Sequence, residues 1–347
     1  MRVAKSIGEP ASDPMGAAGS AAFARNNSTF QSGFEQRWPQ LRNPHVRALA
    51  WLLDAPDLLA PTSPHWQGRI ASLGPVTQVT ADWLLALERN PTPLDEALGQ
   101  RISPRLGLYA EKLMAFYFAQ HGKLVAHGMQ VRASRNDTVG EFDFLLRDGD
   151  KLLHWELATK FYLLDDLPST TPDDGRFNGL IGPNLADTLG LKMRKIFDHQ
   201  LTLAQHPAAQ ALLPQPVDLA QALVKGWLFY PRHVVPALEG IAQPHCQGFW
   251  LPEEEMDSLS GAHYAILPRL HWLAPWKSGP EGVLSGEELR AAVADLQRDH
   301  AAPVMVAEMV AAAEGDGWLV EAQRGFVVPP GWQERAAARR AAGTLPT

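Results

Sequence analysis

The chain has 347 residues, of which 46% are hydrophobic, and a formal net charge of −7. This length can bury a large apolar core in one or two domains, and the sequence lacks the run of about 18 apolar residues that marks a membrane span. Cys246 is the only cysteine, which excludes an intramolecular disulfide and a zinc site of several thiolates. The acidic charge argues against a protein that coats nucleic acid through bulk electrostatics. With no apolar block typical of a signal peptide, we expect a cytoplasmic globular protein.

The first 100 residues are expected to contain a tail and a helical region. Residues 1–35 are rich in Ala, Gly, Ser and Asn without periodicity, which is typical of a flexible tail. Apolar residues recur at helical spacing from Asn43, and a second helix is expected from Asp82 to Arg89. We therefore predict a small helical region over 36–100.

A helix and a strand are expected at the start of the next region. Ser103-Pro104 is a favourable helix start, with an N-cap residue followed by proline. Glu111 falls at the margin of this helix's apolar stripe, where its carboxylate faces either a cleft or solvent. The stretch 124–133 alternates as a strand does.

The stretch from Gly140 to Leu164 is typical of a β-hairpin. Asp148-Gly149 suits the positive φ angles of a tight turn, and this loop would place Asp143 opposite His154. Because side chains alternate along a strand, one face would carry Phe142, Phe144, Leu153, Trp155 and Leu157, and the other Glu141, Asp143, His154, Glu156, Ala158 and Lys160. Carboxylates directly opposed on adjacent strands repel by roughly 0.2–1 kcal/mol per pair unless a cation or donor lies between them. The alternative interpretation is an ordinary solvated face of a hairpin.

A long helix is expected from Asn184 to about His206, followed by a buried strand over 222–231. Lys192 falls inside the apolar stripe of this helix, so its amine either extends to the helix edge or faces a site. His199 and Gln200 lie near the same face, so the same two alternatives apply to them. Further along, we predict a capped helix from Ser285 to about Arg298, a helix over about 303–313 and a hairpin from Gly317 to Val328.

The order helix, three strands, helix, strand resembles the core of the PD-(D/E)XK nuclease-like superfamily, with Glu111 on the first helix, Asp143 on the second strand and Glu156 on the third. The resemblance covers about 101–232. It implies an α/β (α+β) fold with a restriction-endonuclease-like αβββαβ core, preceded by the helical region and followed by a C-terminal α+β extension over 233–347.

Five segments also look like the uncharacterised bacterial family DUF1853. They span most of the chain: RLGLYAEKLMAFYF, GEFDFLL, HWELATKFYL, GPNLADTLGLKMRKIFDHQL and RGFVVPPGW. This family has no established function that the resemblance could transfer.

The superfamily resemblance implies that Asp143 and Glu156 hold Mg²⁺ (or Mn²⁺), with Glu111 nearby. Such an ion would polarise a phosphate oxygen and activate a water for in-line attack. The superfamily's lysine lies two residues after the acid, where this chain has Ala158. Two lysines are candidates to replace it: Lys160 reaching back along the strand, or Lys192 arriving from the helix.

Two functions remain open from the sequence. One is a metal-dependent nuclease that cleaves DNA or RNA; the other is a catalytically degenerate protein of the same fold that binds nucleic acid or regulates. A lysine amine that converges on Asp143 and Glu156 would favour the enzyme, and an amine that points away would favour the binding module. Candidates for phosphate contacts, or else ordinary surface charges, are Arg132, Arg135, Lys151, Arg194 and Lys195.

Overall fold

The computed structural model describes residues 29–135, 137–165, 177–232, 236–313, 315 and 317–343. Most of the predicted tail, residues 1–28, lies outside the described residues. Its last part is helical, because α1 (Phe30–Arg37) begins there. The side chain of Thr29 caps α1 by accepting the N–H of Ser32, and Phe34 is buried in the core. The apolar contact of Phe34 fixes a segment that composition alone assigned to the tail.

Three helices form the region predicted over 36–100: α2 (Pro44–Asp54), α3 (Gln78–Arg89) and α4 (Thr92–Leu98). The side chain of Asn43 caps α2 as expected. Helix α3 begins before the predicted start at Asp82, since Thr77 supplies its cap. Helix α5 (Leu106–Gln120) follows and carries Glu111.

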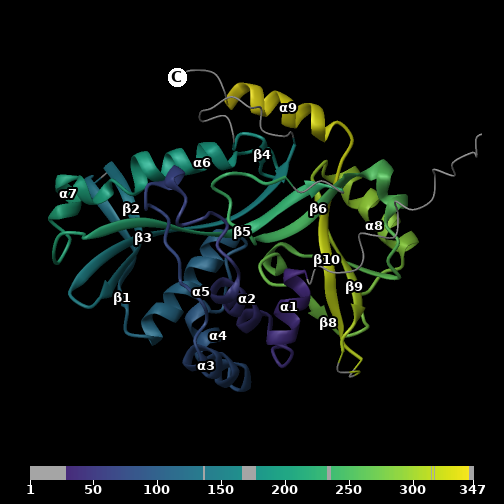
Figure 1. Cartoon of the computed structure of the whole chain (residues 1–347), viewed down its shortest axis with the longest axis horizontal. Coiled ribbons are helices and arrows are strands. Elements are labelled where there is room, and N and C mark those ends of the chain that lie inside the picture. The colour runs from purple at the N-terminus through teal and green to yellow at the C-terminus, as the bar shows by residue number, and fades with distance from the viewer. Residues whose placement is uncertain are drawn as a thin grey trace, which may run out of the picture.

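A ten-stranded mixed sheet forms the centre of the described part of the chain (Figure 1). Its order is β1-β2-β3-β5-β6-β10-β9-β7, with β4 beside β3 and β8 beside β10. The pairs β3–β5, β5–β6 and β6–β10 are parallel and the others antiparallel. The strands are β1 (Leu124–Ser134), β2 (Asp137–Asp148), β3 (Lys151–Leu164), β4 (Leu180–Ile181), β5 (Leu219–Pro231), β6 (Cys246–Pro252), β7 (His263–Ile266), β8 (Lys277–Ser278), β9 (Val304–Ala311) and β10 (Leu319–Val328).

Helices cover both faces of this sheet (Figure 1). Helices α1 to α5 lie below it in that view, and α6 (Leu189–Lys195), α7 (Pro207–Gln210) and α9 (Trp332–Gly343) lie above; α8 (Gly286–Asp299) lies beside the C-terminal strands. The order α5-β1-β2-β3-α6-β5, with the two-residue β4 before α6, follows the predicted αβββαβ pattern. The mixed α/β class is confirmed. Among the described residues, no helix has both the length and the apolar character needed to cross a bilayer.

The C-terminal region extends the sheet begun by the earlier strands. Trp51, Trp227 and Phe326 come from the three predicted regions and share one apolar cluster. The rings of Trp51 and Trp227 stack with centroids 6.4 Å apart. The apolar core therefore continues across the predicted boundaries at residues 100 and 232.

Two C-terminal elements differ in kind from their predictions. The helix expected over 303–313 is wrong, because β9 occupies this stretch and pairs with both β10 and β7. The hairpin expected from Gly317 to Val328 is also wrong, because a single strand, β10, occupies this stretch and pairs with β9. The capped helix from Ser285 is confirmed as α8, with the reciprocal Ser285 and Glu288 hydrogen bonds of a capping box.

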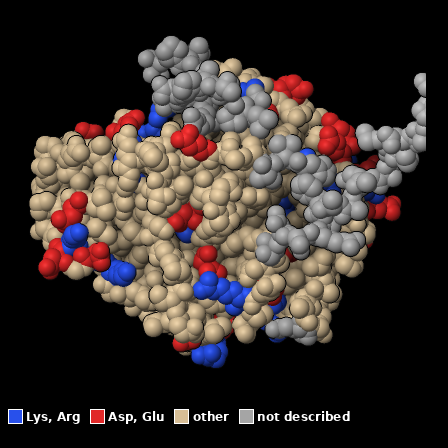
Figure 2. Space-filling view, in the orientation of Figure 1, with Lys and Arg blue, Asp and Glu red and all other residues tan. Residues whose placement is uncertain are grey.

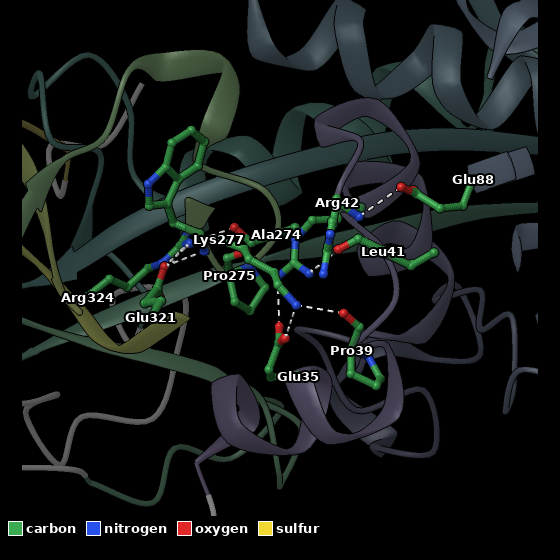
Figure 3. A network of polar contacts seen from close by, with 12 residues as sticks. Glu35, Pro39, Leu41, Arg42, Glu88, Ala274, Pro275, Lys277, Glu321 and Arg324 are labelled. Carbon is green, nitrogen blue, oxygen red and sulfur yellow. Dashed lines mark hydrogen bonds and ion pairs between the residues drawn. The ribbon is translucent and has the colours of Figure 1, made fainter. Parts of the chain in front are cut away.

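Charged side chains of both signs are scattered over the face of the molecule shown in Figure 2. A different set is buried and joins the N-terminal helices to the C-terminal strands (Figure 3). Glu35 of α1 accepts from Lys277 of β8 at 2.6 Å and from Arg47 of α2 at 3.3 Å. Arg324 of β10 donates through Nε to Glu321 Oε1 at 2.7 Å, and through a second nitrogen to Oε2 at 2.6 Å. The ion pair of Glu35 with Lys277 thus joins the N-terminal helices to the C-terminal strands, in addition to their apolar contacts.

Candidate functional site

The hairpin of β2 and β3 turns one position later than predicted. Asp148 pairs with Lys151, which leaves Gly149 and Asp150 as the loop. Gly149 has φ of 58°, a conformation that glycine adopts without steric cost. His154 therefore lies opposite Leu145 and not opposite Asp143, so the predicted register is wrong. A shift of two positions leaves the faces unchanged wherever the strands stay paired.

The two strands separate at Asp143. Their ladder ends with the pair Phe144 and Trp155. Phe144 packs against Phe118 of α5, with ring centroids 5.3 Å apart, whereas Phe142 lies in a different apolar cluster with side chains of β1. The predicted common face of the two phenylalanines is therefore wrong, because the alternation of β2 breaks at the residue between them.

The side chains of Asp143 and Glu156 lie where the backbone ladder stops. The N–H of Leu157 donates to Asp143 Oδ2 at 2.9 Å, and the N–H of Asp143 approaches Glu156 Oε1 at 3.4 Å. His154 Nε2 donates to the same Glu156 oxygen at 2.7 Å. His154 and Glu156 are 0% and 1% exposed. Both predicted acids are thus held by groups of the two diverging strands.

The helix that covers this face is shorter than predicted. Thr188 caps α6 by accepting the N–H of Leu191, and Leu185 has a left-handed φ of 59°, which a helix starting at Asn184 could not contain. A π-helical turn, η2 (Ile196–Gln200), follows α6. Such turns are frequent at functional sites, and this one brings Gln200 to the acids.

Gln200 joins Glu156 to Lys192. Its Nε2 donates to Glu156 Oε2, and its Oε1 accepts from Lys192 Nζ at 3.3 Å. The carboxylate of Glu156 therefore accepts on both oxygens, from His154 on one side and Gln200 on the other. The sequence predicted Gln200 near this helix face but left open whether its side chain faces a site, because its position depends on the π turn.

Lys160 is engaged elsewhere. Its Nζ donates to Asp187 Oδ2 at 2.8 Å, and the hydroxyl of Tyr162 donates to the same oxygen at 3.2 Å. Of the two lysines considered for the missing position at Ala158, only Lys192 belongs to the hydrogen-bonded chain that ends on Glu156.

Burial and crowding of like charges perturb the acids. Burial is the main cause that raises the pKa of Asp143 to about 8, and the charges of Glu156 and Glu111 add to it. Burial likewise raises the pKa of Glu111 to about 7, with contributions from Glu141 and Glu156. Burial lowers the pKa of the Lys192 amine. The positive charge of Lys192 in turn lowers the pKa values of Glu111 and Asp143 and so partly offsets their upward shifts. The raised pKa values place the protonation equilibria of Glu111 and Asp143 near neutral pH.

The raised pKa of Asp143 predicts a pH-dependent stability. Its folded value of about 8 exceeds the ordinary 3.8, so the folded state binds more protons, and the free energy of unfolding should fall as pH rises from about 5 to 8. Asp143→Asn cannot ionise and should be more stable than wild type at pH 8, by on the order of 2 kcal/mol. Urea denaturation at both pH values measures this. Equal pH slopes in wild type and Asp143→Asn would contradict it, and Asp150→Asn, at the exposed turn, is the control.

The donors fit a hard divalent cation in kind but not in their present arrangement. Asp143, Glu156 and Glu111 offer the carboxylate oxygens that Mg²⁺ prefers, and a cation would relieve the repulsion that adds to the effect of burial on the pKa values of Asp143 and Glu111. Yet within the described ranges no three His, Cys, Asp or Glu side chains are grouped closely enough to hold a metal ion. A cation that reaches Glu156 Oε2 would first have to displace Gln200.

The predicted phosphate-contacting residues are all exposed, but they come from separate elements. They lie at the end of β1, at the hairpin tip and on the outer side of α6. The guanidinium of Arg132 donates to Gln130 at 2.7 Å. On the face shown in Figure 2, Lys and Arg are interspersed with Asp and Glu. The residues concerned are Arg132, Arg135, Lys151, Arg194 and Lys195.

The fold and the site define a mixed α/β protein whose sheet carries a buried acidic cluster where β2 leaves β3. The chain belongs to the family described as a domain of unknown function, DUF1853, which matches residues 47–328. This span contains every strand of the described sheet and the whole acidic cluster, and it confirms the family resemblance of the five segments. Comparisons with curated proteins and with solved structures gave no match.

Proposed function

We propose that the chain is a metal-dependent nuclease with a PD-(D/E)XK nuclease-like core that cleaves phosphodiester bonds in DNA or RNA. The observation that carries the proposal is the gathering of Glu111, Asp143, Glu156 and Lys192 from four elements into one interacting cluster. Structural ion pairs also perturb pKa values, but carboxyls shifted toward neutral pH beside a half-buried amine mark a candidate functional site.

Each residue has a distinct part in this proposal. Asp143 and Glu156 would hold Mg²⁺ or Mn²⁺, with Glu111 nearby; when bound, the ion supplies a Lewis acid for a phosphate oxygen and lowers the pKa of a water. Lys192 would place its amine, already directed at the acids through Gln200, beside the negative charge that develops on the phosphate. Burial of this amine lowers its pKa, which makes proton donation near neutral pH easier.

A second function is favoured by one specific observation. Both oxygens of Glu156 accept hydrogen bonds from protein side chains, and Lys160 is paired with Asp187. A site satisfied in this way suits a catalytically degenerate protein that binds nucleic acid or regulates without cutting. The two functions differ in whether Gln200 releases Glu156.

A cleavage assay separates these functions. Wild type should cleave at least one of labelled single-stranded DNA, duplex DNA, branched DNA or RNA in the presence of Mg²⁺ or Mn²⁺. Asp143→Ala and Glu156→Ala should lose this activity, because each removes a carboxylate of the cluster, while Asp150→Ala at the exposed turn should keep it. Circular dichroism checks that every variant is folded.

Two results would count against the nuclease. Equal cleavage by wild type and both cluster variants would mean that another site or a contaminant is responsible. The absence of metal-dependent cleavage by folded wild type would favour the binding module, which gel-shift measurements with the same nucleic acids would then test.

A further inference from the structure

A cavity of about 260 Å³ lies beside the start of α2, far from the acidic cluster along the sheet. It is bordered by α2, by the segment 270–278 that includes β8, and by the start of β10. None of the described residues that line it is an Asp or a Glu, although the chain as a whole is acidic. Its polar and aromatic lining includes Arg42, Arg47, His271, Trp276, Lys277 and Trp318.

The floor of the cavity carries buried positive charge. The side chains of Arg47 and Lys277 are 4% and 1% exposed, and both pair with the single carboxylate of Glu35 (Figure 3). Glu88 lies nearby, but its carboxylate accepts the backbone N–H groups of Arg42 and Asn43. Both cations also donate to backbone carbonyl oxygens. Two cations with one carboxylate leave one net positive charge, whose field attracts an anion more strongly in this desolvated place than at the surface.

The walls of the cavity are aromatic. The guanidinium of Arg42, an exposed residue, lies 4.9 Å from the ring centroid of Trp318. The ring of His271 meets that of Trp276 edge to face, at 4.4 Å and 76°. Tryptophan faces and a stacked guanidinium are surfaces on which a planar ring packs well.

We propose that this cavity binds a planar aromatic ligand that carries a negative charge, and that its ligand class is a nucleoside monophosphate. The base would pack against Trp276 and Trp318, and the phosphate would face Arg42 and Lys277. The volume lies just below the range of about 300–1,000 Å³ that is usual for ligand sites, so it suits a ligand no larger than one nucleotide. The inference is independent of the nuclease proposal, because it uses no residue of the acidic cluster.

Isothermal titration calorimetry of the full chain tests this with three probes: AMP, adenosine and inorganic phosphate. AMP should bind saturably, and the other two should bind at least about fivefold more weakly, since each lacks either the charge or the ring. If phosphate binds as tightly as AMP, the cavity is a simple anion site. If adenosine binds as tightly as AMP, the cavity is a neutral apolar pocket. Either result, or the absence of saturable AMP binding, would overturn the proposal.

Variants then locate the bound AMP. Trp318→Ala and Arg42→Ala should each weaken AMP binding by about fivefold or more, and Trp318→Phe should retain most of it because a ring is kept. Arg298→Ala, at an exposed position on α8, is the matched control and should bind as wild type does. Asp143→Asn should also bind AMP normally. If Asp143→Asn loses AMP binding, or if Trp318→Ala binds AMP as tightly as wild type, the ligand lies elsewhere and the proposal is overturned.

Discussion

Glu321→Ala is expected to destabilise the protein by about 3–5 kcal/mol, because it leaves a buried arginine without its carboxylate. Arg324 is 0% exposed, and two of its nitrogens donate to Glu321. The same guanidinium lies 4.2 Å from the ring centroid of Trp227. Glu321 also accepts the N–H of Trp276 at 2.9 Å. The substitution would thus strand a charge in the core and free a backbone donor. Urea denaturation at pH 7 measures the loss.

The control is an ion pair of the same chemistry on the surface. A guanidinium nitrogen of Arg298 lies 2.8 Å from Asp295 Oδ1, and the two side chains are 71% and 69% exposed. Asp295→Ala should therefore change the free energy of unfolding by less than about 0.5 kcal/mol. A loss below about 1 kcal/mol in Glu321→Ala would contradict the assigned role of the buried pair.

Lys192→Met is expected to lower the single-turnover cleavage rate by about 100-fold to 1000-fold, the usual cost of removing one donor that stabilises developing charge. Lys160→Met should lower the rate by less than about fivefold, since Lys160 is paired with Asp187, which lies outside the cluster of Glu111, Asp143 and Glu156. The two lysines thus provide a direct comparison of the alternatives for the position held by Ala158. Quench-flow measurement on the preferred nucleic acid, with metal in excess, gives both rates.

The matched control is Lys123→Met, an exposed lysine at the start of β1 that should cleave at the wild-type rate. If Lys160→Met lowers the cleavage rate more than Lys192→Met does, then Lys160 and not Lys192 stabilises the charge that develops on the phosphate. Wild-type rates in both variants would contradict a lysine-assisted reaction.

Much of the sheet was predictable because its local signals agree. The strand over 124–133 and the buried strand over 222–231 are found as β1 and β5, extended by a few residues. In the capping box at Ser285, two side chains satisfy backbone donors locally, so distant contacts cannot change the outcome. The stretch 303–313 lacks such a signal: it is rich in alanine, and only pairing with β10 and β7 makes it a strand. Helix and strand are poorly distinguished in short apolar runs.

The candidate site was predictable in composition but not in geometry. Spacing on the hairpin placed Asp143 and Glu156 on one face, and both do meet in the structure. The register, the break in β2 and the separate packing of Phe142 depend on how the strands diverge, which no residue pattern encodes. The contact of Gln200 with Glu156 depends on the π turn after α6. A helix wheel, which assumes 3.6 residues per turn, cannot show it.

Calorimetric titration of Mn²⁺ into the protein tests most directly whether the acidic cluster holds a divalent cation once Gln200 releases Glu156, as we propose. Wild type should bind one Mn²⁺ with release of protons, so that affinity rises from pH 6 to 8. Gln200→Ala should bind roughly tenfold more tightly, because no hydrogen bond to a carboxylate has to be broken, and Asp143→Asn should bind far more weakly. Equal Mn²⁺ affinity in all three proteins, or no binding by any of them while they remain folded, would contradict a metal site at this cluster.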